Sequence, residues 1–170
     1  FARATGKLAK TDTLDARVLA HFAEAIRPEP RPLPDAETQK LAGLVTRRQQ
    51  LAGMITAEGN RLRTAPVQVR PEIKEHIEFM RKQLAKVDAE LKRTLRAPKF
   101  RDKDRILQSA KGVGPVASAT VLAKFPEAGT LGRHCAAALI GVAPLNRDSG
   151  KFHGKRSIWG ERSCVRPALY

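Results

Sequence analysis

The sequence predicts a mainly α-helical protein: a first helix, a long antiparallel helical pair and a compact basic lobe. Three observations predict this fold class. Apolar residues recur at helical spacing along much of the chain, one stretch keeps a regular heptad seam, and a glycine-rich turn later separates two short helices. At 170 residues the chain fits about one domain, which a long hairpin can divide into lobes.

The first predicted helix begins near residue 11, where either Thr11 or Asp12 can serve as the N-cap. Apolar residues then follow at helical spacing: Val18, Leu19, Phe22 and Ile26. Prolines occupy alternate positions from Pro28 to Pro34, which forbids a continuing helix and favours an extended, semi-rigid connector. The main boundary is therefore expected between residues 1–34 and the next segment.

Residues 35–100 are expected to form a coiled-coil hairpin. Its first helix carries a seam that Arg48 and Glu58 interrupt, with apolar residues near heptad positions a and d: Leu41, Leu44, Leu51, Ile55 and Leu62. After a break at Pro66–Pro71, the second seam keeps spacings of 4, 3, 4, 3 and 4 through Ile73, Ile77, Met80, Leu84, Val87 and Leu91. Such a pair can pack only on itself, or it can also recruit a second copy of the protein.

Residues 101–170 are expected to form the compact lobe. Helices are predicted over 102–110 and 115–124, with two shorter ones over 133–140 and 161–169. Glycines and basic residues fill the stretch 141–160, which predicts a loop or small hairpin there.

Charge indicates the class of partner. The chain carries 32 Lys and Arg against 17 Asp and Glu, for a net charge of +15 and a pI near 10.6. A polyanion, with nucleic acid first, is the expected partner. Aromatic residues make up only 5% of the chain, so phosphate contacts are expected to outweigh base stacking.

Cysteine usage and hydropathy predict the compartment. Cys135 and Cys164 are too few and too far apart for a disulfide framework or a Cys-rich zinc site, and they fit a reducing cytosol. There is no run of 18 apolar residues and no signal peptide before the first helix. A cytoplasmic protein that does not enter a membrane is expected.

A glycine turn is the first candidate for a nucleic-acid contact. Gly112 and Gly114 lie between two short helices, as in a helix-hairpin-helix motif, and Lys111 precedes them. Glycines let a phosphate approach the backbone closely, and the following helix N-terminus favours an anion. An ordinary tight turn before a helix is the alternative interpretation.

A serine on a basic loop is the candidate nucleophile. Ser149 stands beside Gly150 among four cations, Arg147, Lys151, Lys155 and Arg156. Such cations can hold a phosphodiester and stabilise the charge that develops when an alkoxide attacks phosphorus. A solvated basic loop is the simpler alternative.

Two acids are candidate metal ligands. Asp12 and Asp15 are spaced i, i+3 and so project from one helix face, as carboxylates that bind Mg²⁺ do. Two carboxylates do not complete a site, and helix caps or surface acids explain such a pair more often than a metal ion does. The histidines form no predicted metal cage: His21, His76, His134 and His153. Only His153 lies near the candidate serine, where it could contact phosphate or assist proton transfer.

An ordered set of motifs resembles a known family. The set comprises 7–16 (KLAKTDTLDA), 112–115 (GVGP), 141–144 (GVAP) with 148–150 (DSG), and the final 165–170 (VRPALY). Together these resemble the insertion-sequence one-ten family of bacterial transposases, which are DEDD-type, guide-RNA-directed serine recombinases. The order and spacing of the motifs match over nearly the whole chain.

The resemblance implies a ribonuclease-H-like domain with four acids and a transposase domain with a catalytic serine, joined by a coiled coil. Residues 1–34 would then be the end of the first domain and residues 101–170 the second. Asp12 and Asp15 match the last two acids and Ser149 matches the serine. The resemblance further implies Mg²⁺, a covalent phosphoserine link to DNA, a structured guide RNA, and dimers that meet in a tetramer. The first two acids would precede Phe1, so the chain alone is expected to be inactive.

Three functions are therefore weighed. The first is a DNA transposase or site-specific recombinase. The second is a non-catalytic helix-hairpin-helix module that binds DNA and dimerises through its coiled coil, and the third is an RNA-binding adaptor. Loss of the Ser149 hydroxyl separates the first from the second, because only a recombinase needs it to join DNA.

Overall fold

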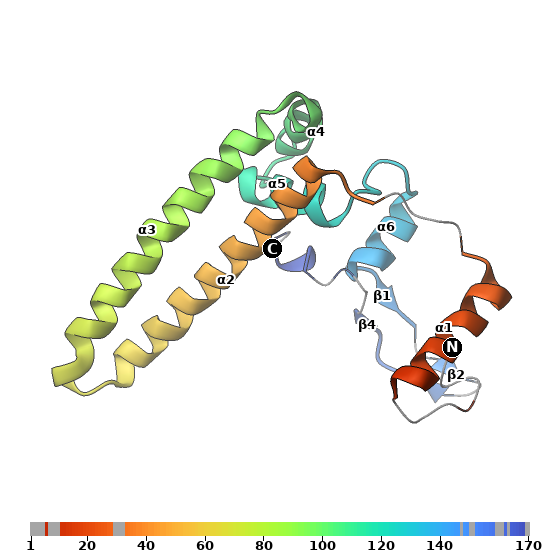
Figure 1. The fold of residues 1–170 in the computed structure, drawn as a ribbon, viewed down its shortest axis with the longest axis horizontal. Coiled ribbons are helices and arrows are strands. Elements are labelled where there is room, and N and C mark those ends of the chain that lie inside the picture. Colours follow the sequence, from red (N-terminus) through yellow and green to blue (C-terminus); the bar gives the residue numbers. More distant parts are fainter. Residues whose placement is uncertain are drawn as a thin grey trace. The chain divides into compact units, whose positions relative to one another are not determined.

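The computed structural model describes residues 6, 11–28, 33–146, 148–149, 152–158, 162 and 164–168. Helices dominate these residues, which confirms the predicted mainly α class (Figure 1). The chain divides into two compact units, Phe1–Pro34 and Asp35–Tyr170. Across the described part of the chain, no helix is both long and apolar enough to cross a membrane.

The first unit contains helix α1, Asp12–Ile26. Of the two candidate caps, Thr11 holds the N-cap position, where its hydroxyl accepts a hydrogen bond from the Leu14 N–H at 3.3 Å. The helix ends at Arg27, whose N–H donates to the carbonyl of Ala23 at 3.0 Å and whose left-handed backbone (φ 46°) then stops the helix. The predicted connector falls largely on residues 29–32, which lie outside the described residues.

Two long helices form an antiparallel hairpin, α2 (Ala36–Thr64) and α3 (Arg70–Leu95), joined by the 3₁₀ turn Val67–Val69 (Figure 1). Asp35 caps α2 by accepting a hydrogen bond from the Thr38 N–H at 2.9 Å. The predicted break is shorter than Pro66–Pro71, because Pro71 lies in the first turn of α3, where its missing N–H costs no hydrogen bond.

The hairpin seam follows the heptad prediction in part, since three of the six predicted α3 residues are only half-buried, namely Ile73, Leu84 and Val87. Helix α3 buries Ile77, Met80, Leu91 and Leu95. In α2 the buried residues are Leu41, Val45 and Leu51, whereas Leu44 is only half-buried. Helix α2 packs against α5 as well as α3, and this second partner turns Val45 inward.

Two Lys or Arg side chains of α2 pair with acids of α3 near the lobe end of the hairpin. Arg48, which interrupts the α2 seam, donates a hydrogen bond to Asp88 of α3 at 2.7 Å. Lys40 lies 2.6 Å from Glu90. Lys40 and then Arg93 lower the pKa of Glu90 below its ordinary value. These pairs hold α2 and α3 in register near the end of the hairpin that carries the lobe.

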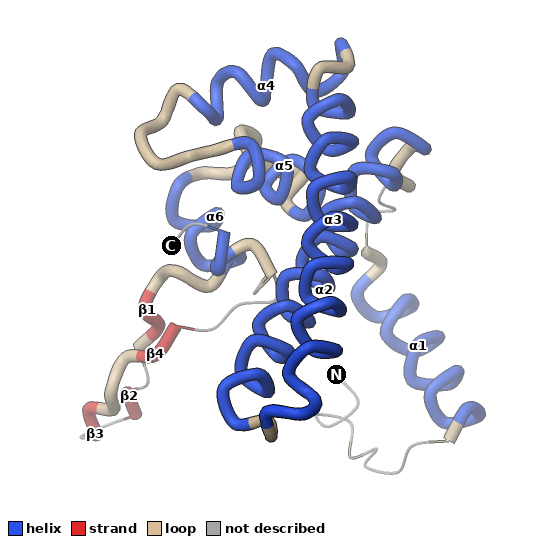
Figure 2. Tube along the Cα trace, turned by 90° about the vertical axis from the view of Figure 1, so that its left-hand side faces the viewer, coloured by secondary structure: helices blue, strands red, loops and turns tan. Residues whose placement is uncertain are grey.

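Three short helices make up much of the lobe (Figure 2): α4 (Pro98–Gln108), α5 (Pro115–Lys124) and α6 (Arg133–Ile140). Helices α5 and α6 start where predicted. Helix α4 starts at residue 98 instead of 102, because Pro98 suits the first helical position.

Two clusters form the core. The first joins the base of the hairpin to the lobe and consists of Leu41, Val45, Leu91, Leu95, Phe100 and Ala119. The second lies within the lobe and consists of Val121, Phe125, Ile140 and Val165. The base of the hairpin and the lobe therefore share buried surface, and each depends on the other for its packing.

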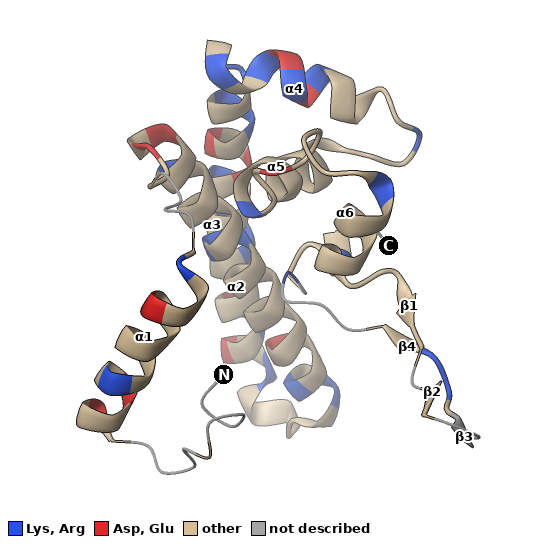
Figure 3. Cartoon of the chain, turned by 90° about the vertical axis from the view of Figure 1, so that its right-hand side faces the viewer, with Lys and Arg blue, Asp and Glu red and all other residues tan. Residues whose placement is uncertain are grey.

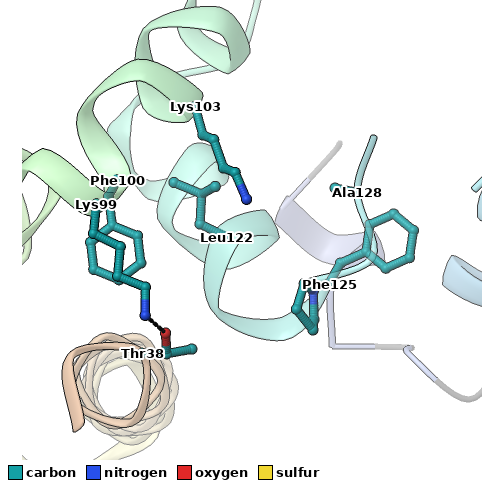
Figure 4. Close-up of a pocket in the computed structure, with 8 residues that line it drawn as sticks. Thr38, Lys99, Phe100, Lys103, Leu122, Phe125 and Ala128 are labelled. Atoms are coloured by element: carbon teal, nitrogen blue, oxygen red, sulfur yellow. Dashed lines mark hydrogen bonds between the residues drawn. The ribbon is translucent and has the colours of Figure 1, made fainter. Parts of the chain in front are cut away.

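Polar contacts reinforce this junction. Lys99 of α4 donates to the Thr38 hydroxyl at 2.8 Å (Figure 4). Lys99 also pairs with Asp35 at the start of α2. The Lys99 contact, with the Thr38 N–H bond, lowers the pKa of Asp35 from 3.8 to about 2. Lys124 of α5 donates to the Thr46 hydroxyl at 2.8 Å.

The segment after α6 forms the small hairpin predicted within residues 141–160. Strand β1 (Pro144–Leu145) pairs antiparallel with β4 (Ser157–Ile158), and β2 (Asp148–Ser149) pairs antiparallel with β3 (Phe152–His153).

The helix predicted over 161–169 is wrong. Among the residues of this stretch that the structure describes (162 and 164–168), the regular element is the 3₁₀ turn Arg166–Ala168. Pro167 has no N–H to donate and restricts the residue before it, so it disfavours a regular helix. Val165, immediately before this turn, is completely buried in the second core cluster and anchors the C-terminal segment.

Candidate functional site

The connection between α4 and α5 is a tight turn over Ser109–Gly114. Gly112 has a left-handed backbone (φ 91°), a conformation in which residues with a side chain are strained. The Val113 N–H donates to the carbonyl of Ala110 at 3.1 Å and closes the turn. Gly114 is the N-cap of α5 with an extended backbone (φ −90°, ψ 178°), which most residues can adopt.

The turn is open to an approaching ligand. A Cβ added at Gly112 or Gly114 would meet no atom of the described structure within 4 Å. No side chain caps the first turn of α5, so its N–H groups and the positive end of the helix dipole face this turn. Lys111, Gly112 and Gly114 are all exposed. The three predicted residues therefore lie together on a surface whose chemistry suits a phosphate.

Polar bonds inside the lobe hold the two helices that flank the turn. Asp104 of α4 accepts a hydrogen bond from the Ser118 hydroxyl of α5 at 2.5 Å. Both of its carboxylate oxygens also lie 2.8 Å from the Gln108 amide nitrogen. Sequence reasoning missed Asp104, although its i, i+4 spacing to Gln108 is a signal for a pair on one helix face. Its partner Ser118 gives no local signal.

Ser149 lies on the small hairpin. It ends β2, its Cα partner across the strand pair is Phe152, and it is exposed. Asp148 pairs in the same register with His153, so the backbone places this histidine opposite the residue that precedes Ser149. Arg147 and Lys151 lie outside the described residues, as does Gly150.

Two predicted cations follow on the same hairpin. Lys155 and Arg156 occupy the basic link between β3 and β4 (Figure 3), and both are exposed. Because β4 pairs with β1 while β3 pairs with β2, the strands that flank this link are held by both pairings. An exposed hydroxyl and two exposed cations thus share one short antiparallel structure, which can present them to a phosphodiester.

Asp12 and Asp15 are exposed in the first turn of α1. Acids at this position also complement the helix dipole. Their oxygen chemistry fits Mg²⁺, which proteins bind with one or two carboxylates together with waters and substrate oxygens. Among the described residues, no group of three His, Cys, Asp or Glu is arranged to hold a metal ion. The two acids belong to the first unit, and Ser149 belongs to the second.

The two parts of the chain that carry these residues match transposase families. Residues 1–71 match the model of the DEDD transposases of IS110, described as Transposase. Residues 104–170 match a second model, described as Transposase IS116/IS110/IS902 family. The chain resembles transposases of the IS110 family. This confirms the resemblance predicted from the ordered motifs, since IS110 is the insertion-sequence one-ten family. A search of curated proteins finds no match.

The two matched segments contain different candidate residues. Asp12 and Asp15 lie in the first matched segment, and the glycine turn, Ser149 and the basic link lie in the second. Most of α3 falls between the two segments. An IS110-type transposase acts on DNA, so the matches indicate a DNA-processing enzyme in general terms.

Proposed function

We propose that this chain is part of an insertion-sequence transposase in which Ser149 cuts and rejoins DNA. The observation that carries the proposal is the exposed serine on a basic hairpin within a segment that matches a transposase family. In the proposed step, the Ser149 Oγ attacks a DNA phosphorus and forms a phosphoserine ester. The bond from phosphorus to one deoxyribose oxygen breaks, and that oxygen takes up the proton that serine loses. Reversal with a different strand end joins DNA without an external energy source.

The proposed roles of the charged groups follow from their chemistry. Lys155 and Arg156 would hold the phosphodiester and offset the charge that develops on phosphorus. Asp12 and Asp15 would hold Mg²⁺, which supplies Lewis-acid stabilisation of phosphate charge when bound. Because these acids are exposed, they are accessible to a metal ion and to substrate oxygens.

A strand-transfer assay tests the serine. Ser149→Ala, placed in a full-length transposase that contains this sequence, should abolish both joining and the covalent protein–DNA adduct. Ser157→Ala is the matched control, because Ser157 is an exposed serine of the neighbouring strand β4. Joining that survives in Ser149→Ala would refute the proposal and favour a non-catalytic DNA-binding module.

We propose that the glycine turn also contacts a DNA phosphate. The open space at Gly112 and Gly114 supports this role, as does the uncapped first turn of α5. Gly114→Ala should cost at most about 1 kcal/mol of folding free energy, because its backbone is ordinary and no atom lies near the added methyl group, although alanine is a poorer N-cap than glycine. The methyl group should still obstruct a phosphate and weaken duplex binding several-fold. Gly112→Ala is less informative, because its positive φ strains the folded protein itself.

Two further partners are proposed. The first is a second copy of the chain, which would pack on the hairpin. Exposed apolar side chains along the hairpin support this partner, namely Met54, Val67, Val69 and Phe79. Sedimentation at increasing protein concentration tests self-association, and Phe79→Lys is expected to yield monomers.

The second proposed partner is a structured guide RNA, which the net charge of +15 favours. Binding of structured RNA without any DNA transaction would instead favour an adaptor function.

A further inference from the structure

A hydrogen bond between Ser118 of α5 and Asp104 of α4 joins the two helices that flank the glycine turn, and we call this bond the lock. Ser118 is completely buried, and its hydroxyl donates to the carboxylate of Asp104 at 2.5 Å. These two residues lie 14 positions apart, on opposite sides of the turn. Gln108, at the end of α4, donates to the same carboxylate. One half-buried side chain therefore ties the last turn of α4 to the second turn of α5.

The placement of Asp104 is unusual for a protein that binds an anion. A carboxylate beside a phosphate site repels the ligand, so electrostatics alone would favour a neutral residue here. Helix α4 also carries Asp102, which is exposed and pairs only with the neighbouring Arg101 at 3.3 Å among the contacts recorded for the described residues. The two acids lie on one helix with the same charge but differ in their contacts. Only Asp104 bonds to α5.

We propose that Asp104 is a positioning residue that fixes the turn in its phosphate-binding form. This inference rests on the proposed contact between the glycine turn and DNA. Gly112 and Gly114 allow phosphate to approach, but glycines also leave the free turn many other conformations. The bond from Ser118 to Asp104 removes much of that freedom by fixing both flanks, so less ordering is needed when phosphate binds. The proposal therefore requires that the repulsion between the Asp104 carboxylate and phosphate be smaller than this gain.

The sign of the change in affinity tests the lock. Asp104→Ala removes a negative charge and the lock together, so we expect about five- to tenfold weaker binding to a short fluorescein-labelled DNA duplex. Asp102→Ala removes the same charge from the same helix without touching the lock, so we expect about twofold tighter binding. Asp104→Asn keeps an oxygen for Ser118 and, after rotation of the Gln108 amide, a donor for Gln108. It should bind at least as tightly as the original protein.

Ser118→Ala provides an independent variant if Asp104→Ala folds poorly. It removes only one hydroxyl and leaves the Asp104 charge in place, so it should weaken binding somewhat more than Asp104→Ala does. The double variant should bind about as Asp104→Ala does, because both substitutions remove the same interaction. If Ser118→Ala binds as the original protein does and Asp104→Ala binds as tightly as Asp102→Ala, while Gly114→Ala weakens binding, the lock is refuted and the DNA contact of the turn stands.

Hydrogen exchange gives a readout that does not depend on DNA. The Val113 N–H, bonded to the Ala110 carbonyl, should exchange faster in Asp104→Ala and Ser118→Ala but not in Asp102→Ala. Unchanged exchange at Val113 in both variants would overturn the lock. If exchange accelerates as expected but Gly114→Ala and Asp104→Ala both bind duplex normally, the proposed contact between the turn and DNA fails instead.

Discussion

Replacing Leu91 with alanine should destabilise the hairpin and the lobe together. Leu91 is 1% exposed and belongs to the core cluster that joins α2 and α3 to Phe100 of α4 and Ala119 of α5. The substitution leaves a cavity at the point where all four helices meet. Since neither part has this surface buried without the other, the destabilisation should spread to both.

The size of the effect follows from the burial of Leu91. Removing a fully buried leucine side chain costs about 2–5 kcal/mol, through lost transfer free energy and an unfilled cavity. A protein of this size has an unfolding free energy of about 5–15 kcal/mol, so this loss is a large fraction of its stability. At about 2–4 °C per kcal/mol, the melting temperature should fall by roughly 4–20 °C.

Leu84→Ala is the matched control, because Leu84 lies two turns earlier on α3 and is only half-buried. It should cost clearly less than Leu91→Ala. Urea unfolding would be followed by circular dichroism for the helices and by the fluorescence of a dye attached to the lobe thiols, since both Cys135 and Cys164 are exposed. The two probes should give one shared midpoint. Separate midpoints, or equal losses for the two leucine variants, would refute a shared core.

Three other predictions concern charged residues. Because the pKa of Asp35 lies at about 2 in place of 3.8, its carboxylate stabilises the fold above about pH 4, and this contribution is lost as the pH falls toward about 2. Asp35→Asn keeps a capping side chain, so its melting temperature should depend less on pH between those values than that of the original protein. An unchanged pH dependence would exclude this role. Lys155→Ala and Arg156→Ala should each lower the slope of log affinity against log salt by about 0.9 if each contacts one phosphate, whereas an unchanged slope would exclude the contact. Arg162→Ala should cost about 1.5–3 kcal/mol in chemical denaturation, because this half-buried guanidinium donates to the Lys124 carbonyl and a carboxylate; a loss below about 0.5 kcal/mol would contradict this.

The helices were predictable because their signals are local. The seam of α3 depends only on spacing along one helix, and Pro115 marks the start of α5 by its own geometry. Val45 could not be found in this way, since its burial depends on α5, more than seventy residues later in the chain. The absence of a regular helix over the described residues of 161–169 also has a local cause, because Pro167 disfavours helical backbone at its own position and at the residue before it.

The candidate site was predictable in part for the same reason. A glycine pair before a proline specifies a turn from its own dihedral preferences, and the structure has this turn at Gly112–Gly114. The bond between Asp104 and Ser118 needs the fold itself, because neither residue type is unusual in its helix. Polar side chains that meet across a turn leave no periodic signal in a sequence.

The cations of this chain divide between two tasks. Some stabilise the fold through partners that the structure describes: Lys40, Arg48, Lys99 and Arg162. Lys111, Lys155 and Arg156 are exposed, and no ion pair is recorded for them among the described residues. A cation that already pairs with a carboxylate gains little by binding a phosphate, because it must give up that pairing. A solvated cation can bind a phosphate and release only a counterion. Removing Lys111, Lys155 or Arg156 should therefore leave the folding free energy almost unchanged. A loss of DNA affinity in these variants can then be attributed to the interface itself.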